Sequence, residues 1–105
     1  MREYIQVLTT TPSKEEALMI AGKLVQNRLA ACIQVGGPIM STYRWEEKIQ
    51  EDEEWRLTIK TRRDLYKRIE KAIIEIHPYE IPEIISTPLI EGNPEYFEWM
   101  DKELT

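Results

Sequence analysis

A chain of 105 residues, of which 42% are hydrophobic and 31% are charged, has the size and composition of one globular domain rather than of a disordered segment. The net charge of −5 disfavours a nucleic-acid-binding domain, which usually carries a basic face. We therefore expect a single domain over residues 1–105 with no nucleic-acid partner.

The cysteine content and the first residues bear on location. Cys32 is the only cysteine, so no disulfide can form within the chain. The segment MREYIQVLTT lacks a basic region followed by a long apolar run, and no stretch is long enough to span a bilayer. We expect a cytoplasmic protein with no membrane partner.

The first part of the chain predicts a strand, a helix and a long second strand. Residues 3–10 are rich in β-branched and aromatic side chains, which are typical of a strand. Ser13 followed by Glu16 matches a capping box, and apolar residues then recur at helical spacing. Residues 31–45 read as extended, with a bulge or bend predicted at residues 36–38 (GGP).

The middle of the chain predicts a third strand and a second helix. Residues 46–53 are strongly polar and predict a long hairpin connection. Residues 54–62 alternate between apolar and polar side chains, as in a half-buried strand. Asp64 is the expected cap of the second helix. His77 precedes Pro78, and a residue before proline avoids the helical region, so the helix should end there.

The last part of the chain completes a recognisable order of elements. Residues 83–90 predict a fourth strand, and Pro88 within it favours an edge position because proline cannot donate to a central ladder. Asn93 as a cap and Pro94 as the first residue begin a short C-terminal helix. The resulting β-α-β-β-α-β order plus a helix predicts an α+β, ferredoxin-like plait with an antiparallel sheet.

The second strand is unusually long for such a plait. It should continue past the helices as an arm that carries Tyr43 and Trp45. Exposed aromatic side chains and free backbone groups on an arm favour pairing with a second copy of the chain. Packing of these aromatics in the chain's own core is the alternative.

Catalytic motifs are missing from the sequence. It contains no GxxxxGK[ST], GxGxxG, GxSxG or HExxH, and one histidine without a nucleophile elbow does not support a Ser-His-Asp triad. An acylphosphatase-like hydrolase on the same fold would need an arginine and a phosphate loop near the first strand, where residues 9–12 (TTTP) offer only hydroxyls. We therefore predict no catalytic residues and no enzymatic activity.

The segment of residues 77–83 (HPYEIPE) is the densest unusual one. It brings an imidazole, a phenol and two carboxylates together between two prolines. A stiff turn that leads into an edge strand, a site for a metal or polar ligand, and an acid/base group all remain open for it. Cys32 is either a small buried hydrophobe or, with His77, a ligand of a cation such as copper or zinc. Glu80, Glu83 or a second subunit would complete that site.

Several of these residues resemble the signature blocks of the CutA divalent-cation-tolerance family, in order and spacing. The blocks are Ala31-Cys32, Gly37-Pro38-Ile39, Tyr43-Arg44-Trp45, Glu54 with Lys60-Thr61, and His77-Pro78-Tyr79-Glu80 with Pro82-Glu83. Two departures stand out. Glu47 replaces a glycine of many members, and Thr9 and Ile76 replace a thiol and a second histidine of members proposed to bind copper.

The resemblance implies a cytoplasmic subunit that forms a homotrimer by strand pairing, with an architecture similar to PII-type signalling proteins. It implies a role in tolerance of divalent cations, with copper or another divalent cation as a ligand rather than an obligatory cofactor. The expected metal ligands are Cys32, His77, Glu80 and Glu83, and the expected residues of an intersubunit cleft or interface are Tyr43, Trp45, Lys60 and Tyr79. Lys60 on a polar strand face is alternatively a solvated side chain. The functional alternative is a PII-like signalling module that binds a small effector in those clefts.

Overall fold

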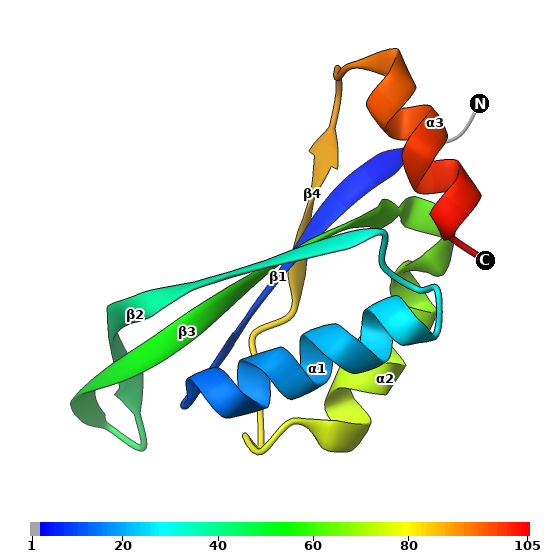
Figure 1. Cartoon of the computed structure of the whole chain (residues 1–105). Coiled ribbons are helices and arrows are strands. Elements are labelled where there is room, and N and C mark those ends of the chain that lie inside the picture. Colours follow the sequence, from blue (N-terminus) through cyan, green and yellow to red (C-terminus); the bar gives the residue numbers. More distant parts are fainter. Residues whose placement is uncertain (1–2) are drawn as a thin grey trace.

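The computed structural model describes residues 3–105 and contains one four-stranded sheet with two helices on one face (Figure 1). The elements are β1 (Tyr4–Thr11), α1 (Lys14–Gln26), β2 (Cys32–Trp45), β3 (Lys48–Arg62), a 3₁₀ turn (Arg63–Leu65), α2 (Tyr66–Ile76), β4 (Ile85–Leu89) and α3 (Pro94–Glu103). The strand order is β2-β3-β1-β4, and each neighbouring pair is antiparallel. The predicted α+β plait with a terminal helix is confirmed.

The core lies between the sheet and the helices α1 and α2. Alternate residues of β1 and β3 face these helices, and the helices contribute the stripes that their periodicity predicted. The fully buried members include Val7, Ile20, Leu57, Ile59, Ile69 and Ile73. Burial of each such side chain contributes about 1.5–3 kcal/mol, so this layer supplies most of the driving force for folding.

Capping residues set two of the helix starts as predicted. The Ser13 hydroxyl accepts a hydrogen bond from the Glu16 amide at 3.2 Å and donates one to the Glu16 carboxylate at 2.8 Å. Asn93 caps α3 by accepting from the amide of Glu95 at 3.0 Å, and Pro94 is the first helical residue. Each cap satisfies amide groups that have no partner within the first helical turn.

The prediction of a capping role for Asp64 is wrong. Asp64 lies in the 3₁₀ turn, and its carboxylate accepts a hydrogen bond from Nε of Arg62 at 3.0 Å. The N-cap position of α2 belongs to Leu65, which makes no side-chain cap hydrogen bond. The buried guanidinium of Arg62 competes for the carboxylate that would otherwise have capped the helix.

The prediction of a long connection over residues 46–53 is also wrong. Lys48 already belongs to β3, and only Glu46 and Glu47 form the turn, both with positive φ (48° and 67°). β2 and β3 therefore pair as far as Trp45 and Lys48. The polar run misled the prediction because both faces of the arm are largely exposed, so no hydrophobic alternation marks it.

The β2–β3 arm extends well beyond the helices and makes the molecule elongated, with extents of 45 × 25 × 22 Å (Figure 1). A register shift between Gly36 and Ile39 marks its beginning, as predicted for the GGP segment. β4 pairs only with β1, so Pro88 occupies an edge strand, also as predicted.

The second face of the sheet is covered only in part. At one end α3 packs on it, since the ring of Phe97 stacks on Tyr4 at 4.2 Å. Arg62 also binds the α3 carboxylate of Asp101 at 3.2 Å and the carbonyl of Thr105 at 2.6 Å. Among residues 3–105 no helix covers the remainder of this face, and Ile85 there is 50% exposed. A single chain thus leaves apolar sheet surface open to solvent.

Candidate ligand-binding cleft

A cleft of about 490 Å³ lies between the arm and the segment that follows α2. Its walls include Tyr43 and Trp45 of β2, Glu54 of β3, and Tyr79, Glu80 and Glu83 of residues 77–83. Three separate parts of the sequence therefore line the cleft. The register of β2 on β3 and the turn after α2 set their relative positions.

His77 fixes the position of the segment after α2. Its backbone amide closes the helix by donating to the carbonyl of Ile73 at 2.8 Å. Its ring nitrogen Nδ1 accepts from the amide of Tyr79 at 3.1 Å, so Nε2 carries the ring proton and donates to the carbonyl of Thr10 at 2.7 Å. The imidazole is buried and connects the end of α2 to β1.

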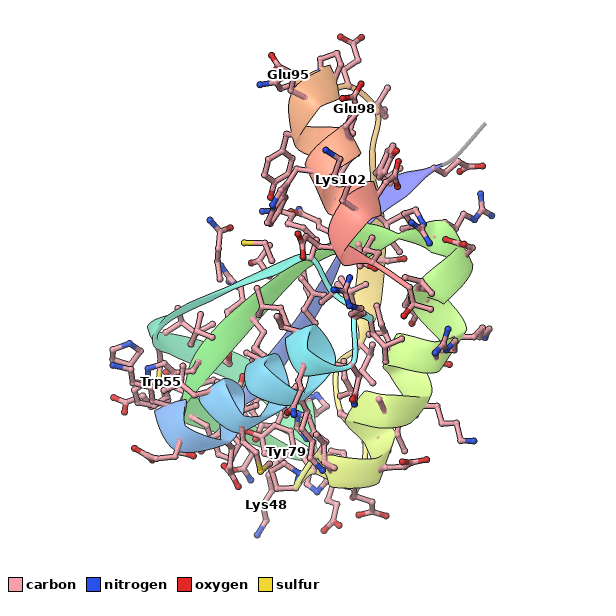
Figure 2. The ribbon with its side chains drawn as sticks, turned by 45° about the vertical axis from the view of Figure 1, so that its right-hand side comes forward. Lys48, Trp55, Tyr79, Glu95, Glu98 and Lys102 are labelled. Carbon is pink, nitrogen blue, oxygen red and sulfur yellow. The ribbon has the colours of Figure 1, made fainter. Side chains whose placement is uncertain are left out.

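Tyr79 connects the segment to the arm. Its hydroxyl donates to Oε2 of Glu54 at 2.7 Å, and Figure 2 shows Tyr79 beside the sheet, below α1. Burial, followed by the hydrogen bond and the charge of Glu54, raises the pKa of Tyr79. The phenol therefore stays protonated and remains a donor throughout the neutral range.

Glu54 is the most buried acidic side chain of the cleft, with 7% of its surface exposed. It stands opposite Ile39, next to the register shift that begins the arm. Among the described residues it takes part in no salt bridge, and the hydroxyl of Tyr79 is its hydrogen-bond donor. In the sequence Glu54 stands out only as part of a family block, so its place in the cleft was not predicted.

The arm supplies an aromatic wall. Tyr43 is 42% exposed and Trp45 is 38% exposed, in agreement with the expected exposed aromatics. The hydroxyl of Tyr43 donates to the carboxylate of Asp52 across the β2–β3 pair, and this hydrogen bond raises the pKa of Tyr43. The wall is held in place on the side of the arm that faces the cleft.

The two remaining predicted site residues lie elsewhere. Cys32 of β2 pairs with Lys60 of β3. Thr10, which lines the cleft, pairs with Arg56, and Arg56 lies four positions before Lys60 on β3. Four strand residues correspond to roughly 13 Å. Lys60 donates from Nζ to Oε1 of Gln34 at 2.9 Å. Cys32 is half-buried beside Tyr96, whose pKa is raised by burial and then by this neighbour.

The four expected metal ligands are thus not brought together within one chain. Glu80 and Glu83 line the cleft, His77 lies behind it with both ring nitrogens in hydrogen bonds, and Cys32 lies near α3. Across residues 3–105, no three His, Cys, Asp or Glu side chains are placed to hold a metal ion. None of the helices in that same part of the chain combines the length and the apolar composition of a membrane span.

Comparison with known proteins identifies the family. A family model described as CutA1 divalent ion tolerance protein matches residues 5–103. The divalent-cation tolerance protein CutA of Thermus thermophilus is 42% identical over 94 residues, which cover 90% of this chain and 91% of that protein. The chloroplastic protein CutA of Arabidopsis thaliana is 38% identical over 96 residues, which cover 91% of this chain but 53% of that protein.

Solved structures agree with these relatives. The crystal structure of CutA1 from Oryza sativa superposes with a TM-score of 0.96 at 37% identity, covering 98% of this chain and 94% of that one. The chain spans nearly the whole of its bacterial relative and about half of its plant relative. On the family match and the 42% identity, the chain belongs to the CutA family of divalent-cation tolerance proteins.

Proposed function

We propose that the chain acts as a homotrimer in the tolerance of divalent cations, copper among them, in the cytoplasm. The names of its relatives support tolerance and favour it over a signalling module. The observation that carries the proposal is the unfinished sheet, which leaves a long edge and part of one face without a covering layer in a single chain.

The sheet offers two different edges for assembly. β2 is an edge strand of 14 residues and β4 is an edge strand of 5 residues. Pairing between unlike edges of successive copies is heterologous and forms a ring when the rotation between copies closes, and the family resemblance implies a ring of three. Large apolar side chains are exposed on the arm, on the segment after α2 and on the second face: Met40 (65%), Ile49 (68%), Ile81 (70%) and Ile85 (50%). Their burial between copies would drive association.

Cation binding is proposed for the clefts that assembly would bring next to neighbouring copies. Glu80 and Glu83 are exposed carboxylates on the cleft wall, and oxygen ligands suit divalent cations. The described residues of one chain offer too few convergent ligands, so binding should be weak and completed by a neighbour. His77 can contribute only by giving up its hydrogen bond to Thr10 or Tyr79, and Cys32 only from another copy.

The proposal includes no catalytic residue. The single imidazole makes two structural hydrogen bonds, and the raised pKa of the Tyr79 hydroxyl beside the Glu54 carboxylate disfavours that hydroxyl as a nucleophile. A single free cysteine is compatible with the reducing cytoplasm. The Arabidopsis relative is named as chloroplastic, so the cytoplasmic location needs its own test. Cell fractionation should recover the protein in the cytoplasmic fraction.

Light scattering tests the assembly, because a trimer has three times the subunit mass of 12.5 kDa. Ile85→Glu places a charge on the uncovered face and should shift the mass toward the monomer. Leu18→Glu is the matched control, since Leu18 is 52% exposed on α1 and lies away from that face. A wild-type chain that remains monomeric in dilute solution rejects the trimer.

Calorimetry tests the metal role. Copper should bind weakly to the wild-type protein, and His77→Ala should lower its affinity if the imidazole is recruited as a ligand. Unchanged copper binding in His77→Ala ends the metal role of that residue. A parallel Cys32→Ser variant reports whether a thiol from a neighbouring copy contributes.

A further inference from the structure

The cleft concentrates negative charge without a cation of its own. Three carboxylates line it, those of Glu54, Glu80 and Glu83, and none of them forms a salt bridge with a described residue. Among the described residues that line it there is no lysine, arginine or histidine. A volume of about 490 Å³ falls within the range of sites for small organic molecules. The electrostatics therefore favour a positively charged occupant.

Glu54 makes this preference strongest at the inner wall. With 7% exposure it is removed from bulk water, and only one of its oxygens, Oε2, accepts a hydrogen bond from the described residues. A buried carboxylate is costly unless a cation or several donors compensate for its lost hydration. Glu54 lines the cleft and its carboxylate accepts one hydrogen bond, from Tyr79 to Oε2, so a cationic donor in the cleft would add to its partners.

The remaining lining distinguishes between kinds of cation. The rings of Tyr43, Trp45 and Tyr79 provide faces that attract ammonium groups by the cation–π interaction. A bare divalent metal needs several oxygens converging within about 2.6 Å. In residues 3–105 the carboxylates do not converge in this way, and they are instead distributed around the cavity.

We infer that the cleft binds an organic cation with two or more ammonium groups, in the class of linear polyamines. Aromatic faces accommodate the methylene chain and attract the ammonium groups, while the separated carboxylates pair with individual charges along that chain. The inference rests on the proposed binding role of the cleft and names its ligand class. A lysine or arginine side chain from a neighbouring copy carries similar chemistry, and the test must distinguish it from a free ligand.

Calorimetric titration of the full chain with spermidine is the direct test, and 1,4-butanediol serves as an uncharged probe. Spermidine should bind saturably and the diol should not. Glu80→Gln combined with Glu83→Gln should weaken spermidine by about two- to fivefold per exposed carboxylate removed. Glu53→Gln is the matched control, because Glu53 precedes Glu54 on β3, is exposed and does not line the cleft. Trp45→Leu should weaken binding by removing one aromatic face.

Three results would overturn the inference. They are an absence of saturable spermidine binding, equal affinity in the double variant and in Glu53→Gln, and equal binding of the diol. An absence of binding is also the result expected if a neighbouring copy fills the cleft with its own basic side chain. Copper titration and light scattering on the same samples separate this inference from the proposed function. A trimer that binds copper but not spermidine refutes the polyamine inference and leaves the proposed function standing.

Discussion

Replacement of His77 by alanine should destabilise the fold whether or not any metal binds. The ring makes two hydrogen bonds in a buried position, donating to the carbonyl of Thr10 at 2.7 Å and accepting from the amide of Tyr79 at 3.1 Å. A neutral hydrogen bond contributes about 1 kcal/mol net, and a buried partner left unsatisfied costs about 1–3 kcal/mol. The expected loss in the free energy of unfolding is about 2–4 kcal/mol.

Two further variants separate the contributions of the two ring nitrogens of His77 to the stability of the fold. Asparagine at position 77 keeps an oxygen near the place of Nδ1 and can still accept from Tyr79, whereas glutamine reaches farther and can still donate to Thr10. His77→Asn and His77→Gln should therefore each lose less stability than His77→Ala.

Urea denaturation of all three variants, at matched protein concentration and without metal, gives the three differences from the wild type. If His77→Ala unfolds within about 0.5 kcal/mol of the wild type, the histidine is not the connection between α2 and β1 that its geometry indicates.

Two other substitutions test neighbouring features. Gly37→Ala should cost about 1–3 kcal/mol, because a Cβ at Gly37 would lie 2.7 Å from Cδ1 of the half-buried Trp55. Gly36→Ala should be nearly neutral, since nothing lies within 4 Å of its Cβ, and equal denaturation midpoints for the two variants would contradict the clash. Tyr79→Phe should cost about 1–3 kcal/mol at neutral pH by removing the donor to Glu54. Because the folded pKa of Tyr79 is raised above its unfolded value of about 10, the wild-type advantage should be complete below pH ~10 and shrink as the pH rises further. A constant difference between the two proteins in alkaline denaturation would refute this coupling.

Periodicity predicted the fold wherever one face of an element is buried. In residues 54–62 the alternation survives because Leu57 and Ile59 contact the helices while their neighbours face the other side. In residues 46–53 both faces are largely exposed, so the acidic run looked like a loop although backbone pairing with β2 makes it a strand. Pairing over that length overrides the low strand propensity of glutamate and aspartate.

The cleft was predicted only in part because its members meet through tertiary structure. The aromatic arm and residues 77–83 were each singled out by their composition, and they do share a cavity. Glu54 escaped notice since an acid within a polar run gives no sign of burial. Cys32 and His77 were grouped by the chemistry of their side chains, but the sheet register separates them along β3. The sequence therefore shows which side chains are able to bind a ligand. The register of the strands decides which of these side chains lie close together.

The turn at the end of the arm consists of two glutamates, Glu46 and Glu47, in the left-handed region that glycine would adopt more easily. Local backbone strain and two like charges therefore lie together at the end of the arm. Approach of the same point on another molecule is repulsive, and salt weakens that repulsion. Charge repulsion therefore disfavours contact between the ends of two arms. The sides of the arm carry no such penalty from this turn and remain available for contact between copies.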